Sequence, residues 1–372
     1  MHLLHLTFLH FMLTFFSGER TLENSLVSPP KDVKSITAND STKSNAKPGA
    51  TNLIYQSIDG GKTWQDISYT LPENEQPAFF AGEAGLYLRY KDKMYYSKSN
   101  LKTPVWENEN NVDPRYAGDH PFDGSIAFNP SGVTAYGWNV QVYQKMGPAG
   151  RGAWSPVYPT LKVVMSGTRR NWVGTVFETS DGTIFVGAGG GLYKSADKGK
   201  SWKHVIKPGW VANLVESKGV LIGTSSGGIM RSTDNGEHWY WAIREGGVGI
   251  AVERIDGGFA AISYNTKTKS RSIHVSFDTG KTWNRIDAGL PPSPNISSIK
   301  QIGSYLICGH PDGIFRSSDM GKTWVMVHGS VDNTMMASTK PLNIGSSNEN
   351  AKVFDIYVSG NVVYAVARSG GC

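Results

Sequence analysis

The sequence predicts an all-β fold, a seven-bladed β-propeller whose blades are four-stranded antiparallel sheets. Three observations predict it: a motif of eight residues that occurs five times, two weakened copies of that motif, and C-terminal strands that supply what the N-terminus lacks. Internal repetition of a short, strand-rich unit at a nearly fixed period is typical of propellers.

The repeated motif has the form Ser-x-Asp-x-Gly-x-x-Trp, and a short run such as Gly-Leu-Tyr-Lys precedes its Ser. The carboxylate can accept hydrogen bonds from the amides of a tight turn, and Gly adopts a positive φ without steric cost. The Trp begins the next strand and is suited to packing against a neighbouring sheet. The motif residues, which we expect to be structural, are Ser57, Asp59, Gly61, Trp64, Ser195, Asp197, Gly199, Trp202, Ser232, Asp234, Gly236, Trp239, Ser276, Asp278, Gly280, Trp283, Ser317, Asp319, Gly321 and Trp324.

These residues resemble the Asp-box, or BNR repeat, of sialidases, sortilin-type receptors, xyloglucanase-type glycosidases and photosystem II assembly factors. The resemblance implies that each box lies on the outer hairpin of a blade, away from the face that binds ligands. An alternative is that the five Asp side chains form a metal or sugar site. Under the structural interpretation we expect no metal site and no cofactor.

The spacing of the boxes predicts the number of blades. Asp59 and Asp197 are 138 residues apart, whereas the later boxes follow at 37, 44 and 41 residues. The long gap therefore holds two further units, around Tyr95-Tyr96-Ser97 and Val142-Tyr143-Gln144, which keep a strand and a Trp but lose the Asp. The seven repeat tryptophans are Trp64, Trp106, Trp154, Trp202, Trp239, Trp283 and Trp324.

Each unit is expected to contain four short strands, and the clearest unit has them at 212–216, 220–224, 228–232 and 238–243. The chain enters the first blade at 53–57, which corresponds to a third strand. Its missing first and second strands are expected at 353–358 and 362–367. The C-terminus would then complete the N-terminal blade and close the ring, so that residues 51–372 form one propeller without an open sheet edge.

The first 50 residues do not belong to the repeat. Residues 1–18 are apolar and end in Ser17-Gly18, which indicates a signal peptide; an uncleaved anchor is the alternative. Residues 19–50 are rich in Ser, Thr, Asn and Lys and are expected to be a flexible linker. We therefore expect a secreted or periplasmic protein with no stable membrane span after signal removal.

Composition excludes some partners. The net charge is +6 and the basic residues are scattered, without the basic run that nucleic-acid binding requires. Of the two cysteines, Cys308 lies in an apolar run and is expected to be a buried thiol. A disulfide between Cys308 and Cys372 is the alternative. We expect a monomer.

The resemblance places ligands on the face opposite the boxes, where turns between second and third strands and the crossings between blades lie. Arg side chains there can clamp a carboxylate or sulfate, and aromatic rings can stack on sugars. The candidate binding residues are Arg115, Tyr116, Arg169, Arg170, Trp172, Trp210, Arg244 and His310. Carboxylates can act as acid and base in glycoside hydrolysis; the candidate catalytic residues are Asp119, His120, Asp123, Glu245 and Asp312. The alternative is that all are ordinary solvated loop residues.

We expect a non-catalytic module that binds a glycan or a protein partner. A glycoside hydrolase is the first alternative, but sialidases of this family have six blades and an Arg-Ile-Pro motif, which is absent here. Xyloglucanase-type enzymes use two seven-bladed propellers in tandem. An assembly factor resembling the photosystem II stability family is the second alternative. It agrees in layout, although 185–187 and 221–223 lack the Trp of that family's Gly-Trp-x-Val-Gly strand.

Overall fold

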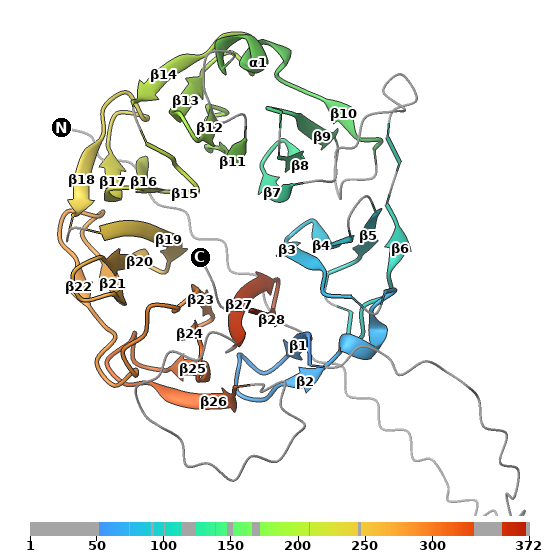
Figure 1. Ribbon diagram of the computed structural model, residues 1–372, viewed down its shortest axis with the longest axis vertical. Coiled ribbons are helices and arrows are strands. Elements are labelled where there is room, and N and C mark those ends of the chain that lie inside the picture. The colour runs from blue at the N-terminus through green and yellow to red at the C-terminus, as the bar shows by residue number, and fades with distance from the viewer. Residues whose placement is uncertain are drawn as a thin grey trace, which may run out of the picture. The chain divides into compact units, whose positions relative to one another are not determined.

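The computed structural model describes residues 52–369 except 74, 91–92, 100, 110, 113–123, 138, 147–151, 166–171, 208, 245–246 and 331–351. The described strands form seven four-stranded antiparallel sheets arranged in a ring (Figure 1). The predicted seven-bladed propeller is therefore confirmed. The predicted signal peptide (1–18), the whole predicted linker (19–50) and Cys372 lie outside the described residues.

The strands of each blade run from the centre of the ring outward. Blade 1 consists of β27 (Lys352–Ser359), β28 (Val362–Ser369), β1 (Ile54–Ser57) and β2 (Gln65–Asp66). Blades 2 and 3 consist of β3 (Ala78–Gly82), β4 (Gly85–Tyr90), β5 (Lys93–Ser97), β6 (Glu107–Asn108), and of β7 (Ser125–Asn129), β8 (Gly132–Tyr136), β9 (Val142–Met146), β10 (Ser155–Pro156). Blades 4 and 5 consist of β11 (Val173–Glu178), β12 (Ile184–Ala188), β13 (Gly191–Ser195), β14 (Lys203–Ile206), and of β15 (Leu214–Ser217), β16 (Val220–Ser225), β17 (Gly228–Ser232), β18 (Tyr240–Ile243).

Blades 6 and 7 follow the same order. They consist of β19 (Gly247–Ile255), β20 (Gly258–Asn265), β21 (Ser270–Ser276), β22 (Asn284–Arg285), and of β23 (Ser298–Ile302), β24 (Tyr305–His310), β25 (Gly313–Ser317), β26 (Val325–Gly329). A 3-10 turn, η1 (Ser68–Thr70), follows blade 1, and a short helix, α1 (Pro159–Met165), follows blade 3.

The ring is closed within blade 1. Strand β28 pairs antiparallel with β1, with Ile54 opposite Val366 and Ser57 opposite Val363. Figure 1 shows the C-terminal strands β27 and β28 beside the N-terminal strands β1 and β2. The predicted completion of the first blade by the C-terminus is confirmed, and the two ends of the propeller hold each other.

The hydrophobic core is divided among the interfaces between blades. Each of seven clusters joins two neighbouring blades, and each contains one of the seven repeat tryptophans. For example, Trp239 of blade 5 packs edge-to-face on Phe185 of blade 4, with ring centroids 6.4 Å apart. Each repeat Trp therefore packs against the preceding blade. Cys308 lies in one of these clusters and is fully buried, which raises the pKa of its thiol.

The Asp box is a hydrogen-bonded turn. In blade 4, the Ser195 hydroxyl donates to Asp197 Oδ1 (2.8 Å) and accepts the Gly199 N–H (2.8 Å). Asp197 also accepts the N–H (2.9 Å) and the hydroxyl (2.5 Å) of Ser201. These bonds from Ser201 and Ser195 lower the pKa of Asp197 to about 2. The carboxylate is thus used within its own turn, and among the described residues no group of three metal-ligating side chains is found.

The Gly of the box is required for two reasons. Gly199 has a φ of +80°, and a Cβ at this position would lie 2.2 Å from the Tyr158 ring of the preceding segment. Gly321 repeats the arrangement, with a φ of +88° and only 2.4 Å to Ile286 of blade 6. The missing side chain therefore serves both the turn and the contact between blades.

Blade 3 uses a different device where the box is lost. Aligning Val142-Tyr143 with Leu192-Tyr193 places Lys145 where Ser195 stands in blade 4. The Lys145 side chain is 2% exposed, and its Nζ lies 2.5 Å from Glu109 Oε1 of the segment after β6. A buried ion pair thus joins blades 2 and 3.

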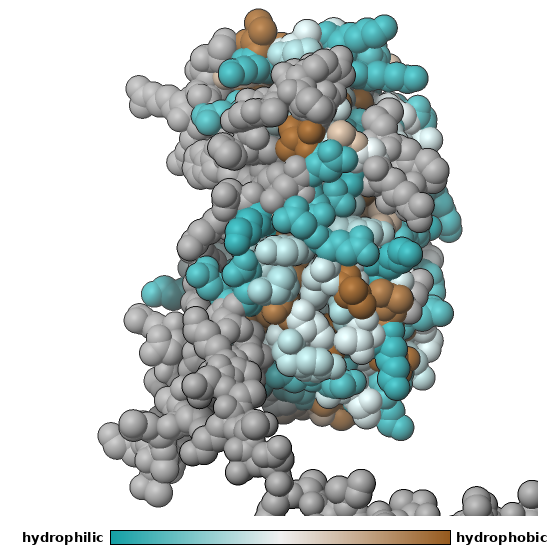
Figure 2. Space-filling model, turned by 90° about the vertical axis from the view of Figure 1, so that its right-hand side faces the viewer, coloured by the Kyte–Doolittle hydropathy of each residue, from teal (hydrophilic) through white to brown (hydrophobic). Residues whose placement is uncertain are grey.

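The outer side of the ring faces water. Figure 2 views the side that carries β6 and β10, where hydrophilic residues dominate and hydrophobic ones are scattered. Within the part of the chain that the structure describes, no helix has the length and apolar character needed to cross a membrane.

Candidate functional site

The antiparallel order of strands gives the ring two different faces. The Asp-box turns and the turns between first and second strands lie on one side, which we call the Asp-box face. The turns between second and third strands, and the ends of the fourth strands, lie on the other side, which we call the open face. The ligand-binding and catalytic residues predicted from the sequence belong to the open face.

The predicted site residues divide into two sets. The ones that lie outside the described residues are Arg115, Tyr116, Asp119, His120, Asp123, Arg169, Arg170 and Glu245. The described ones are Trp172, Trp210, Arg244, His310 and Asp312.

His310 is part of the fold. It is 1% exposed, its Nδ1 accepts the Asp312 N–H (3.1 Å), and its Nε2 lies 3.0 Å from the Pro291 carbonyl oxygen, to which it then donates. Burial lowers the pKa of His310. The His310 ring therefore joins the turn after β24 to the segment that precedes β23, while the Asp312 carboxylate remains exposed on that turn.

The segments that carry Trp172 and Trp210 approach each other at Gly174 of β11. A Cβ at Gly174 would lie 2.2 Å from the Trp172 ring and 3.2 Å from the Val211 carbonyl oxygen. Since Trp210 directly precedes Val211, the bare backbone at Gly174 lets the two tryptophan-bearing segments approach each other. Both tryptophans are partly exposed.

A third tryptophan, Trp241 of β18, was missed by the sequence prediction. Its ring lies against the turn between β16 and β17, because a Cβ at Gly227 would be 2.6 Å from it. Trp241 is 44% exposed, and the Arg244 guanidinium lies 5.4 Å from its ring centroid. The signal was present in the sequence: Trp239 packs on blade 4, and a residue two positions later on a strand faces the same side.

We call Trp172, Trp210, Trp241 and Arg244 the tryptophan platform. Gly209 and Gly227 place two of its segments on the same turn, since Cβ atoms there would meet Ser226 Oγ at 2.9 Å and the Trp241 ring at 2.6 Å. The platform offers partly exposed aromatic surface with one cation beside it. Such a surface can stack on sugar rings and bind an anionic group.

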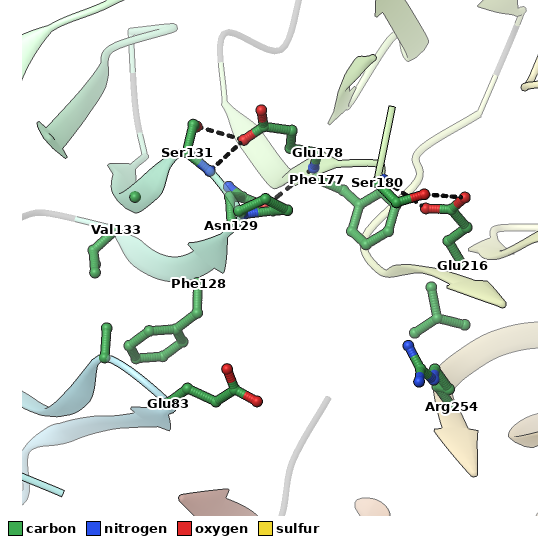
Figure 3. Close-up of a pocket in the computed structure, with 14 residues that line it drawn as sticks. Glu83, Phe128, Asn129, Ser131, Val133, Phe177, Glu178, Ser180, Glu216 and Arg254 are labelled. Carbon is green, nitrogen blue, oxygen red and sulfur yellow. Dashed lines mark hydrogen bonds between the residues drawn. The ribbon is translucent and has the colours of Figure 1, made fainter. Parts of the chain in front are cut away.

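A cavity of about 960 Å³ opens on the Asp-box face, among the first turns of blades 2 to 6 (Figure 3). Glu178 of β11 accepts the Ser131 N–H of blade 3 at 3.0 Å, and the Ser131 hydroxyl also donates to it. Glu216 of β15 accepts the Ser180 N–H (2.8 Å) and hydroxyl (3.1 Å) of blade 4. These carboxylates tie each blade to the preceding one.

The same tie recurs in blade 7, where the Asp256 N–H of blade 6 donates to Gln301 Oε1 at 2.6 Å. The cavity wall also carries Glu83 and Arg254, which Figure 3 shows on two sides of the opening. Within the described residues, neither Glu83 nor Arg254 has a hydrogen-bond or ion-pair partner, whereas Glu178 and Glu216 are both held. Glu178 and Glu216 therefore stabilise the ring by joining neighbouring blades.

A closed ring of seven four-stranded blades, pinned by Asp boxes, defines the chain as a β-propeller. A family model of the BNR-Asp box repeat matches residues 314–327, which span most of β25 and the box of blade 7. The chain is therefore a seven-bladed β-propeller in which one repeat matches the BNR-Asp box model. A comparison with curated protein sequences found no match.

Several solved structures are similar to this chain at low sequence identity. The GH74 xyloglucanase from Xanthomonas campestris is 16% identical, with a TM-score of 0.53 over 72% of this chain and 50% of the enzyme. An oligogalacturonate lyase in complex with manganese is 10% identical, with a TM-score of 0.46 over 78% of this chain and 88% of the lyase. The extracellular domain of a hybrid two component system from B. thetaiotaomicron is 10% identical, with a TM-score of 0.47 over 77% of this chain and 39% of that domain. The chain thus spans about half the length of the xyloglucanase.

Proposed function

We propose that this protein is an exported, non-catalytic module that binds a glycan on its open face. The tryptophan platform carries the proposal. The Trp172 ring packs at Gly174 of the inner strand β11, and the Trp241 ring packs at Gly227 with the Arg244 guanidinium beside it. The segment that carries Trp210 contacts both regions, at Gly174 through Val211 and at Ser226 through Gly209.

The physical basis is the match between platform and sugar. The apolar faces of sugar rings gain dispersion and desolvation energy on flat aromatic rings, which lose little side-chain entropy on binding. The close packing at Gly174 and Gly227 pre-organises the Trp172 and Trp241 rings, which reduces the cost of ordering them when the ligand binds. Arg244, whose guanidinium lies over the Trp241 ring, can add a charge-assisted hydrogen bond to a carboxylate or hydroxyl group.

A glycan array with purified protein tests this proposal, followed by titration of the best glycan against variants. Trp241→Ala is expected to weaken binding by about tenfold, the equivalent of about 1.4 kcal/mol. Tyr240→Ala is the matched control, because Tyr240 is the neighbouring residue on β18, is 65% exposed, and points to the other side of the strand. It is expected to leave the affinity within about twofold.

Three results would contradict the proposal. An unchanged glycan affinity of Trp241→Ala would show that the tryptophan platform is not the binding site. No glycan bound at high protein concentration would favour a protein partner instead. Turnover of a fluorogenic glycoside panel would make the protein a glycoside hydrolase, with Asp119, Asp123, Glu245 and Asp312 as the carboxylates to substitute first.

A further inference from the structure

We infer that the glycan is anionic, a polysaccharide with carboxylate or sulfate groups, and that it extends from the tryptophan platform onto the hairpin of blade 6 that carries Lys267 and Lys269. This inference rests on the proposed function and names its ligand class. It is carried by the length of that hairpin, by its position beside Arg244, and by the distribution of charge on the open face.

The hairpin between β20 and β21 extends further on the open face than its neighbour. From the residue that pairs with the box Ser, β16 continues for four residues to Ser225, whereas β20 continues for six residues to Asn265. At about 3.4 Å per residue, two extra residues lengthen the hairpin by roughly 7 Å. Its tip, residues 266–269, is exposed.

The hairpin lies next to the platform. Arg244 is followed after two residues by Gly247, and Gly247 pairs with Asn265 at the base of the hairpin tip. The tip is held by Asn265, whose Oδ1 accepts the N–H groups of Lys267 (2.9 Å) and Thr268 (3.2 Å). The two lysines are therefore carried on an ordered turn close to the end of the platform.

The charge of this region is mostly positive, although the sequence places Glu245 directly after Arg244. Lys207, Arg244, Lys267 and Lys269 are all exposed, and none has an ion-pair partner among the described residues. Within the described open-face segments of blades 4 to 6, the one carboxylate is Asp287, which is buried and paired with Arg285 at 2.5 Å. The unpaired cations leave a positive field that attracts a polyanion.

Aromatic surface followed by unpaired cations fits a polymer of rings with regularly spaced negative groups. Nucleic acid also has rings and charges, but the chain lacks the basic run that such binding needs, and its net charge is only +6. We therefore assign an acidic polysaccharide, and nucleic acid becomes an outcome of the test.

The experiment compares polygalacturonate with its fully methyl-esterified form, by titration calorimetry at low and at high salt. The two polymers share a backbone and differ in charge. We expect polygalacturonate to bind at least tenfold more tightly at low salt, and the difference to shrink at high salt as charges are screened. A second comparison uses dextran sulfate and uncharged dextran. If charge strengthens binding more in this comparison than in the first, the inference holds with sulfate as the recognised group.

The variant Lys267→Gln/Lys269→Gln is expected to lower the affinity for polygalacturonate about tenfold and to leave the methyl ester unaffected. The matched control is Lys62→Gln/Lys281→Gln, which removes the same charge from two exposed lysines of the Asp-box face. It is expected to change neither affinity.

The outcomes separate this inference from the proposed function. The inference of an anionic ligand would be overturned if the charged and uncharged polymers of both comparisons bound equally, or if the two lysine variants had equal effects. A loss of affinity in Trp241→Ala would in that case still support the proposed function. Binding of single-stranded polyuridylate as tight as that of the best polysaccharide would overturn the inference in favour of nucleic acid. Loss of the Trp241→Ala effect on every glycan would overturn the proposed function itself.

Discussion

Blades 2 and 3 close their outer hairpins without an Asp box, while the other five blades all use one. In blade 2 the Ser survives, and Ser97 Oγ accepts the Val105 N–H at 3.0 Å, but no Asp completes the turn. In blade 3 the Ser position is Lys145, buried and paired with Glu109. Both blades keep the repeat Trp in the interface with the preceding blade.

The difference teaches that the box is a replaceable device for joining blades. In boxed blades the residue before the Ser reaches the box of the next blade: Arg231 Nε donates to the Thr279 carbonyl (2.7 Å), and Arg316 Nε to the Gly60 carbonyl (2.9 Å). Between blades 2 and 3 the Lys145–Glu109 pair takes this part. Because one ring accepts both solutions, the box residues belong to the architecture, and the recognition of a ligand is carried elsewhere.

The largest effect is expected where the box has been replaced. Glu109→Gln leaves the Lys145 ammonium buried without a counter-charge, which typically costs about 3–5 kcal/mol of the free energy of unfolding. Chemical denaturation measures it. Glu107→Gln, an exposed residue of the adjacent β6, is the control and should change stability by less than about 0.5 kcal/mol. Equal stabilities of the two variants would show that the ion pair does not replace the box.

A smaller effect is expected from the Gly of an intact box. Gly321→Ala places a Cβ 2.4 Å from Ile286 at a φ of +88°. The backbone strain and the overpacking together should cost about 2–4 kcal/mol. Gly219→Ala isolates the strain, because Gly219 has a φ of +72° and no atom within 4 Å of the added Cβ; it should cost about 1 kcal/mol. If both variants lose the same stability, the contact between blades contributes nothing.

The smallest effect concerns pH. Hydrogen bonds lower the pKa of Asp197 and of Asp319 to about 2, below the unfolded value of about 3.9. A lowered folded pKa stabilises the fold above the unfolded pKa, and this stabilisation is lost as pH falls through the folded pKa. Stability should therefore decline between about pH 4 and pH 2, and less steeply in Asp197→Asn/Asp319→Asn. Identical pH profiles of variant and parent would contradict the role of the boxes.

The architecture could be predicted from the sequence because a local sequence motif recurs in most of the blades. The spacing of the boxes predicts the blades, and the observed β27 and β28 lie within two residues of the predicted 353–358 and 362–367. The replacement at Lys145 could not be predicted, since its partner Glu109 lies 36 residues away in another blade. Local patterns record turns and strands, and contacts between blades are set by the closed ring.

The candidate site was predicted only in part, for the same reason. Trp172, Trp210 and Arg244 were chosen by their place on loops, and in the structure Arg244 lies beside Trp241, which the sequence prediction missed. His310 was chosen on the same grounds, yet its ring is buried and is hydrogen-bonded to the Pro291 carbonyl oxygen. Whether a loop side chain turns outward or inward depends on a neighbouring segment, and residue type alone does not reveal it.

The central claim is that the boxes hold the ring and the platform binds the ligand. The direct test measures thermal stability and glycan affinity in parallel for Ser195→Ala and Trp241→Ala. Ser195→Ala leaves the buried Gly199 N–H without its acceptor, so the account predicts a lower Tm and an unchanged Kd at a temperature where the protein is folded. Trp241→Ala is predicted to raise Kd about tenfold with little change in Tm. The reverse pattern, a raised Kd in Ser195→Ala and an unchanged Kd in Trp241→Ala, would contradict the account.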